Sequence, residues 1–237
     1  MSNNIVELSG ALAITDVQSY PGVSQKSLVV QGWIETGPAY LGERHAFIAI
    51  DQKARIILDY ARETGGNQIN LFQTEEALVG VSAHGKLLPI GEKSTLVVKH
   101  ISFFDVSNPV RPCGMDDFYT NIVRMQGILS IPKSKTTETV VGGFEYPFRI
   151  GELLTEKAGD NSAHRLVIPE EMASGLADEM QTRGKKALEA SLVGSLLSLN
   201  ETSFVKVKFL SLCQEVFAAN FSEVVPFAYA LQEKVCE

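Results

Sequence analysis

The chain has little of what marks several specialised classes of protein. Its 237 residues include three cysteines, Cys113, Cys213 and Cys236, without CxxC spacing, which argues against a disulfide framework or a zinc site. No apolar run reaches the roughly 18 residues of a membrane-spanning helix. The first residues lack the basic and apolar segments of a signal peptide. We therefore expect a cytoplasmic protein with no membrane segment and no metal site.

An excess of basic residues is also missing. The formal net charge is −7, with 8 basic and 11 acidic side chains in residues 1–110 and 13 and 17 in the remainder. This balance argues against a protein that holds duplex DNA through many phosphate contacts, although a local basic groove is compatible with it. The chain has no nucleophile with a base at a readable spacing and no glycine-rich cofactor fingerprint. We predict that it is not an enzyme and needs no cofactor.

What the chain does have is a pattern that it uses twice. Residues 4–12 read NIVELSGAL and residues 121–129 read NIVRMQGIL, so Asn-Ile-Val, Gly and Leu recur at the same offsets. Without any gap between them, residues 85–103 and 194–212 also share glycine, leucine and serine positions. Such ordered matches favour two homologous domains.

Hydrophobic periodicity predicts the same order of elements in both repeats. In the first repeat it predicts a helix at 52–63 and strands at 4–13, 26–35, 45–50, 78–88 and 95–106. In the second repeat it predicts a helix at 169–181 and strands at 121–131, 140–154, 164–168, 191–198 and 203–212. His45 and His164 each open the third strand of a repeat. Loops are predicted at 16–25, 133–139 and 156–162.

Five strands with a helix between the third and the fourth have the order of an OB-fold barrel. A glycine inside the first strand suits a barrel, because the strand must bend sharply there. We predict an all-β chain, with one short helix per domain, that forms two tandem OB-fold barrels of five strands. The predicted organisation is a first domain at 1–108, a linker at 109–118, a second domain at 119–213 and a C-terminal extension at 214–237.

Residues 4–12, 45–65 and 81–103 resemble the domain of bacterial single-stranded-DNA-binding proteins and of their primosomal relative PriB. Those proteins open with an Asn-led apolar strand that ends in Gly, and their third strand carries a Trp-His-Arg-Val-Val-type run. Residues 163–167 (AHRLV) are similar to that run without its Trp, and the first repeat departs further. Some members carry two such domains per chain. The family's acidic tail with a terminal Pro-Phe is not present in that form, since ten residues follow Phe227.

The resemblance implies a protein that binds single-stranded nucleic acid, DNA in preference to RNA, in replication, recombination or repair. It also implies a homo-oligomer. Such binding needs flat side chains on which bases stack and cations that follow the phosphates. The candidates in the first repeat are Lys26, Trp33, Tyr40, Phe47 and Lys86, with Arg44 and Lys93 as further phosphate contacts. The candidates in the second repeat are Lys133, Lys135, Tyr146, Phe148, Arg149 and Arg165.

The second repeat offers the denser group, because Phe144, Tyr146 and Phe148 alternate along one face of a strand. We therefore expect it to be the better platform. Instead of binding bases, Phe144, Tyr146 and Phe148 could line the inner face of the barrel. Trp33 and Phe47 could likewise lie in the core.

A different class of function also fits the sequence. The chain would then be a protein-interaction or structural module that forms a homo-oligomer or complex without nucleic acid. The negative charge, the single tryptophan and the apolar stretch at 215–237 motivate this alternative. That stretch either packs on the barrels or contacts a protein partner.

Overall fold

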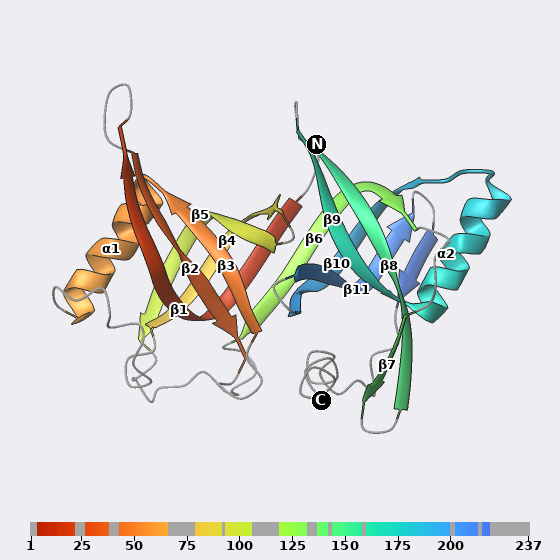
Figure 1. Ribbon diagram of the computed structural model, residues 1–237, viewed down its shortest axis with the longest axis horizontal. Helices are drawn as coiled ribbons and strands as arrows, with labels where there is room; N and C mark the ends of the chain where they lie inside the picture. Colours follow the sequence, from red (N-terminus) through yellow and green to blue (C-terminus); the bar gives the residue numbers. More distant parts are fainter. Residues whose placement is uncertain are drawn as a thin grey trace. The chain divides into compact units, whose positions relative to one another are not determined.

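The computed structural model of the chain is an all-β fold, with two helices in the part of the chain that it describes (Figure 1). The described residues are 4–21, 27–37, 43–65, 79–91, 93–105, 119–131, 137–141, 144–157, 160–199, 202–212 and 215–218. Contacts between Cα atoms divide the chain into two compact units. The first unit comprises Val6–Leu88 and Thr95–Asn121, and the second comprises Met1–Ile5, Pro89–Ser94 and Ile122–Glu237. The predicted linker at 109–118 lies outside the described residues.

The strands of the first repeat close into a barrel. They are β1 (Asn4–Tyr20), β2 (Ser27–Thr36), β3 (Glu43–Ile50), β4 (Val79–Ile90) and β5 (Lys93–Asp105). Strand β2 pairs antiparallel with β1 and β3, and β1 pairs antiparallel with β4. Strand β3 runs parallel to β5, which neighbours β4, so the circle closes as β1-β2-β3-β5-β4. This is the OB fold that the order of elements predicts.

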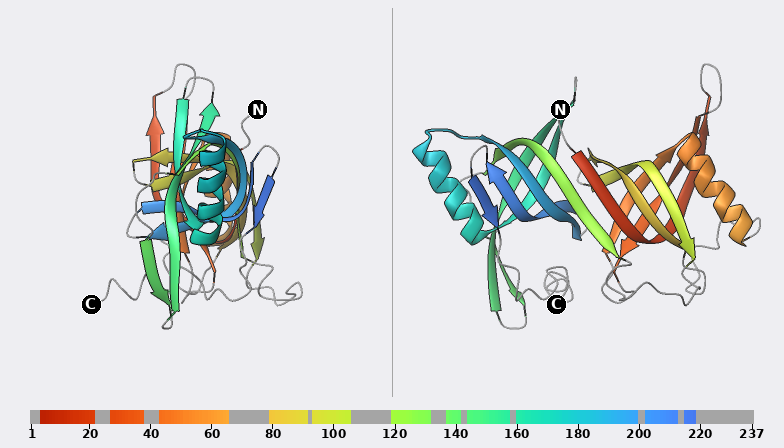
Figure 2. Two further views of the ribbon diagram at one scale, coloured as in Figure 1. Left: turned by 90° about the vertical axis from the view of Figure 1, so that its right-hand side faces the viewer. Right: turned by 180° about the vertical axis from the view of Figure 1, so that it is seen from behind.

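The second repeat forms an equivalent barrel from β6 (Thr120–Ser130), β8 (Phe144–Lys157), β9 (Asp160–Pro169), β10 (Leu188–Leu199) and β11 (Thr202–Leu212). The circle closes as β6-β8-β9-β11-β10, with the β9–β11 pair again parallel. Two short strands are added to it. Strand β7 (Thr137–Val141) pairs with β8, and β12 (Glu215–Ala218) pairs with β11. Figure 2 shows the strands of both barrels from two further sides.

Each barrel carries one helix between its third and fourth strands. Helix α1 (Gln52–Gly65) buries Ala54 and Ile57, and the Tyr60 ring stacks on Phe103 of β5 with ring centroids 4.0 Å apart. Helix α2 (Glu170–Thr182) follows Pro169, and two glutamates occupy its first turn, where acidic side chains are favoured. Its buried residues recur at helical spacing; they are Met172, Ala173, Leu176 and Met180.

The glycine of the repeated opening motif has a steric role in both barrels. Strand β1 pairs with β4 up to Leu12 and with β2 from Ala11 onward, so it changes partner just after Gly10. A Cβ atom on Gly10 would lie 1.9 Å from the carbonyl oxygen of Glu35. At Gly127 the same atom would lie 2.1 Å from the carbonyl oxygen of Leu154. Only glycine allows the backbones to approach this closely.

All three predicted loops are partly wrong, because strands extend into them. After a bulge between Ile14 and Asp16, β1 goes on pairing with β2 as far as Tyr20. The bulge breaks the two-residue alternation on which the prediction relied. Similarly, β8 and β9 pair as far as Lys157 and Asp160, so both strands extend into the predicted loop at 156–162. The predicted loop at 133–139 also gives way to strand from Thr137 onward.

Candidate nucleic-acid interface

Strands β2 and β3 present one face to the core and one to the outside of the first barrel. Ile34 and Phe47 are buried, with exposed fractions of 0% and 1%. Because side chains alternate along a strand, the neighbours of Ile34 on β2 and of Phe47 on β3 point outward. These outward residues define what we call the β2–β3 face: Gln31, Trp33, Glu35, Arg44, Ala46 and Ile48.

Trp33 lies on the β2–β3 face between two small neighbours. Its partner in the β1 ladder is Ala13 and its partner in the β3 ladder is Ala46, so neither side chain competes with the indole for space. The guanidinium carbon of Arg44 lies 4.3 Å from the centroid of the Trp33 ring, within cation–π range. The half-buried ring therefore has a cation over it, so an aromatic ring and a positive charge, the two kinds of group that single-strand binding uses, lie side by side.

Glu35 completes this group. The Arg44 Nε donates a hydrogen bond of 3.0 Å to the Glu35 Oε2. Tyr119, which directly precedes β6, lies within electrostatic reach of the same carboxylate. Burial raises the pKa of the Tyr119 phenol, and the negative charge of Glu35 raises that pKa further. Trp33, Arg44, Glu35 and Tyr119 therefore form one local cluster within the first unit.

Two of the predicted stacking aromatics belong to the core. Phe47 is buried inside the first barrel, so its ring cannot receive a base. Phe148 is only 6% exposed and packs in an apolar cluster with Val167 and Leu197. The alternative prediction, that Phe47 lies in the core and Phe148 on an inner barrel face, is therefore correct for these two residues.

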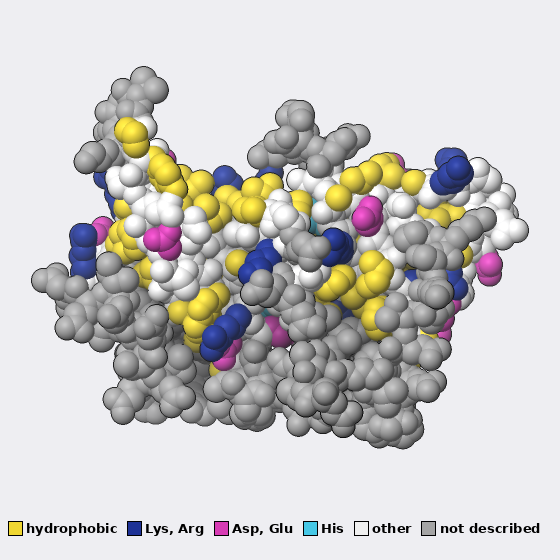
Figure 3. All heavy atoms as spheres, in the orientation of Figure 1, with side chains coloured by type: hydrophobic (Ala, Val, Ile, Leu, Met, Phe, Trp, Pro, Cys, Tyr) yellow, Lys and Arg dark blue, Asp and Glu magenta, His cyan; other side chains and the backbone are white. Residues whose placement is uncertain are grey.

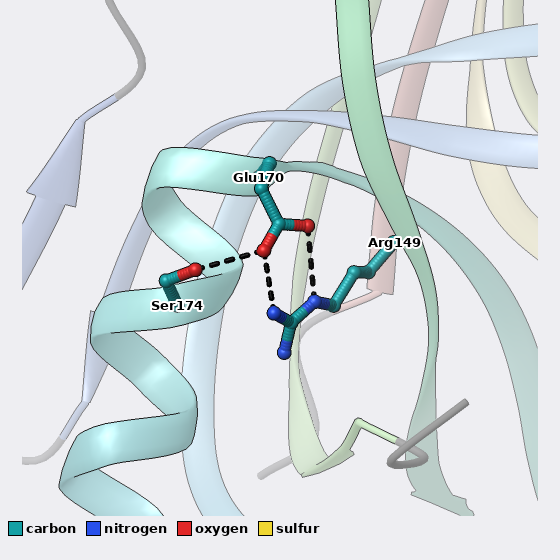
Figure 4. Close-up of polar contacts among 3 residues, drawn as sticks. All are labelled: Arg149, Glu170 and Ser174. Carbon is teal, nitrogen blue, oxygen red and sulfur yellow. Dashed lines mark hydrogen bonds and ion pairs between the residues drawn. The ribbon is translucent and has the colours of Figure 1, made fainter. Parts of the chain in front are cut away.

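Arg149, predicted to contact phosphate, is held by a helix instead (Figure 4). Its Nε and one terminal nitrogen donate to the two carboxylate oxygens of Glu170 at 3.0 and 2.5 Å. The Ser174 hydroxyl donates to the same carboxylate at 2.8 Å. This two-point pair connects β8 to the first turn of α2, so Arg149 stabilises the barrel. Because Phe148 is buried and Arg149 is paired, these two residues do not add to a binding surface on the second repeat.

The other predicted residues are spread over both units. Lys86 is exposed on β4, which β1 separates from β2. Arg165 is exposed on β9, opposite Glu152 of β8. The backbone of Tyr146 pairs with Thr139 of β7. Four residues lie outside the described part of the chain: Lys26, Tyr40, Lys133 and Lys135.

The cluster contains two residues that the sequence analysis did not select. Glu35 stands two residues after Trp33, so alternation places it on the same face, but a carboxylate is not an obvious group at a phosphate-binding surface. Tyr119 is the first residue of the predicted second domain, and no local sequence pattern connects it with β2. Only the tertiary structure brings it to Glu35.

The two histidines predicted to open the third strands lie inside them, after Glu43 and Asp160, and occupy matching buried places. His45 Nε2 lies 2.9 Å from Thr36 Oγ1, and His164 Nε2 lies 3.0 Å from Thr155 Oγ1. Within each unit an asparagine amide approaches the same ring nitrogen, at 3.2 Å from Asn121 to His45 and 3.5 Å from Asn4 to His164. Burial lowers the pKa of both imidazoles from 6.5 to about 4. These rings are neutral and structural at neutral pH.

Neither a metal site nor a membrane-spanning helix is found among the described residues. No group of three His, Cys, Asp or Glu side chains within the described ranges is arranged to hold a metal ion. No helix in that part of the chain has the length and apolar character needed to cross a membrane. On the face that Figure 3 shows, the described Lys and Arg side chains stand in separate groups among hydrophobic and uncharged ones.

Comparison with known proteins identifies the fold. No protein-family model and no curated protein matches the chain. The chain is similar to the crystal structure of the wild-type single-stranded DNA binding protein from Thermus aquaticus, with a TM-score of 0.58 and 15% identity, over 94% of this chain and 99% of that chain. A deletion mutant of that protein, which also carries an arginine-to-alanine substitution, has a TM-score of 0.58 and 13% identity over 92% and 98% of the two chains. At such identity the similarity shows a shared fold that extends over both repeats.

Proposed function

We propose that this protein binds single-stranded nucleic acid, DNA in preference to RNA, without catalysing a reaction. The observation that carries the proposal is Trp33 on the outer face of an OB barrel, with the Arg44 guanidinium 4.3 Å from its ring centroid. The fold shared with the single-stranded DNA binding protein from Thermus aquaticus supports it.

Binding would combine stacking and charge. A base stacks on Trp33, and each stacked base contributes about 1–3 kcal/mol. Arg44 is the proposed phosphate contact next to the ring, and Lys26, Tyr40 and Lys86 stay proposed contacts of the first repeat. In the second repeat Lys133, Lys135, Tyr146 and Arg165 stay proposed contacts. We propose that the first barrel supplies the main platform, because the described candidates Phe148 and Arg149 of the second barrel have structural roles.

The proposed setting is cytoplasmic DNA replication, recombination or repair, where single strands are exposed. A homo-oligomer would present several barrels to one strand and raise the overall affinity. Residues 215–237 are the proposed contact for a protein partner.

Fluorescence of Trp33 tests the proposal, because the chain has no other tryptophan. Titration with oligo-dT at micromolar protein should change the emission, and the affinity should fall as salt is added, with a slope of about 0.7 per neutralised phosphate. Oligo-U and duplex DNA of the same length are the controls, and both should bind more weakly. If no salt-sensitive binding to oligo-dT occurs, the proposal is wrong.

A second candidate function is an interaction module that does not bind nucleic acid. Exposed apolar side chains on the second unit favour it, because Ile128 and Leu154 lie opposite each other on β6 and β8 and are 38% and 36% exposed. The mass in solution of the full chain and of a chain truncated after Gln214 tests it. If the module assembles through the C-terminal extension, truncation should lower the mass, whereas an unchanged monomer would contradict this candidate.

A further inference from the structure

One arginine on the β2–β3 face serves two partners at once. The Arg44 guanidinium lies over the Trp33 ring and also donates to Glu35. The Arg44 side chain is 64% exposed, whereas that of Glu35 is only 15% exposed. Glu35 is therefore the fixed member of the pair, and Arg44 is the member that solvent and ligands can reach.

Glu35 also acts electrostatically on Tyr119. Its negative charge acts on the Tyr119 phenol, whose pKa rises mainly through burial and further through this charge. The carboxylate thus stands among the cation and two aromatic rings of the local cluster. A phosphate that approached Arg44 would meet this negative charge at close range.

Carboxylate and phosphate compete for the same donors of a guanidinium group. In the free protein, Glu35 neutralises Arg44 and holds it over the ring. A base that stacks on that side of Trp33 must displace the guanidinium, and a phosphate that binds Arg44 must replace the carboxylate. We propose that Glu35 is a built-in competitor that keeps the Trp33 platform closed until a nucleic-acid strand takes Arg44 from it. This inference rests on the proposed function.

The second barrel does not have this arrangement. Matching His45 with His164 places Glu152, Leu154 and Ala163 at the positions of Trp33, Glu35 and Arg44. At the positions that correspond to Trp33, Glu35 and Arg44, the second barrel therefore lacks the aromatic ring, the carboxylate and the cation, respectively. The competition is a property of the first barrel alone.

The test replaces Glu35 by an uncharged residue of the same shape. The E35Q variant of the full chain is titrated with oligo-dT at several salt concentrations, with labelled oligonucleotide anisotropy as the signal. Releasing Arg44 from an exposed ion pair should tighten binding about twofold to fivefold. The logarithmic salt slope should steepen by about 0.7, the value for one more neutralised phosphate on a single strand.

A matched control separates this effect from the change in net charge. Glu171 is exposed on α2, and E171Q removes the same charge far along the sequence from β2. Its affinity and salt slope should stay at the wild-type values. In an R44Q background, E35Q should no longer tighten binding, because the two side chains act as a pair. If E35Q and E171Q behave alike, Glu35 is not a competitor.

A second measurement needs no nucleic acid. Freeing Arg44 should uncover the Trp33 ring, so acrylamide should quench its fluorescence more strongly in E35Q, as it should in R44Q. Unchanged quenching in E35Q would overturn the proposed restraint even if the protein binds DNA. If instead quenching rises but no variant binds oligo-dT, the restraint stands and the proposed function, and with it the role of Glu35 as a competitor, is wrong.

Discussion

The outer faces of the two barrels differ at positions that the shared framework makes directly comparable. In the first unit, the ladder between β2 and β3 places Trp33 opposite Ala46 and Glu35 opposite Arg44. In the second unit, the ladder between β8 and β9 places Glu152 opposite Arg165 and leaves an exposed leucine at the next outward position. The first face offers an aromatic ring with a cation, and the second offers opposed charges beside an apolar side chain.

The inner faces of the same strands agree closely. Each third strand contains a buried histidine that contacts a threonine on the neighbouring strand. Each first strand bends at a glycine with no room for a Cβ atom. Closing a five-stranded barrel restricts what fits inside, whereas the outer face is free to differ. Differences between the outer faces of the repeats are therefore the better guide to function. The residues that the repeats share, such as the buried histidines and the glycines, serve to form the barrel.

A second difference concerns packing. Around Phe148 the second unit gathers an apolar cluster with Val167 and Leu197, and Ile150 and Phe204 pack against it. The counterpart of Phe148 in the first repeat is Val29, and that of Ile150 is the polar Gln31. We infer that this part of the second unit contributes to stability, whereas the corresponding part of the first unit carries the proposed binding face.

Among single substitutions, the largest effect is expected from Phe148→Ala. Removing a buried aromatic side chain should lower the free energy of unfolding by about 3–5 kcal/mol, as measured by urea denaturation. The affinity for oligo-dT should not change under conditions in which the variant stays folded. Phe209→Ala is the control, since that ring is 50% exposed, and its effect should be within about 0.5 kcal/mol. A loss of affinity without a loss of stability would place Phe148 on the binding face.

Acid should destabilise both units through the feature that they share. Because burial lowers the pKa of His45 and His164 from 6.5 to about 4, the unfolded chain takes up a proton at a higher pH than the folded chain does. The free energy of unfolding should fall as the pH drops below 6.5, by about 2 kcal/mol per histidine at pH 5, and should level off below pH 4.

Urea midpoints measured between pH 7 and pH 4 check this dependence. The variants H45Q and H164Q should each remove about half of it if the two sites are equivalent. Glu43 lies 3.8 Å from His45 and favours the charged ring, so any inequality should make the His45 contribution the smaller one. A stability that does not depend on pH in this range would contradict the prediction.

The next effect tests the first face directly. Trp33→Leu should weaken oligo-dT binding by about 1–3 kcal/mol, the contribution of one stacked base. Anisotropy of a labelled oligonucleotide is the measurement, because the variant has lost its tryptophan. Glu152→Leu at the matching position of the second unit is the control and should not weaken binding. Equal losses in the two variants would mean that both faces bind the strand.

The order of strands and helices could be predicted from the sequence, because period-2 and period-3.6 patterns are local. The same patterns could not show where hairpin arms end, since the bulge after Ile14 shifts the alternation. Trp33 could be selected because it is the single tryptophan of the sequence and lies on the predicted second strand. Alternation alone leaves two equivalent choices of inner face, and this is why Phe47 and Phe148 were included among the binding residues.

Contacts between distant residues account for the rest of the site. Arg149 and Glu170 are 21 residues apart, and no local sequence pattern predicts that the first turn of α2 contacts β8. The link between Tyr119 and Glu35 spans most of the first repeat. Both contacts are set by the tertiary structure, and no local sequence pattern predicts them.

The smallest effect concerns Arg149, the cation that the second unit uses for structure. Arg149→Lys keeps the charge but cannot form the two-point pair with Glu170, so stability should fall by about 1 kcal/mol. Arg183→Lys is the matched control, because Arg183 pairs with Glu179 one turn away on the same helix, and such helix pairs are worth only about 0.2–0.5 kcal/mol. Urea denaturation measures both. Oligo-dT affinity and its salt slope should stay unchanged in both variants, because neither arginine lies on the β2–β3 face. A loss of oligo-dT affinity in Arg149→Lys alone would return Arg149 to the phosphate contacts, because lysine keeps the charge but not the two-point geometry, and would make the two barrels more alike in function than their outer faces indicate.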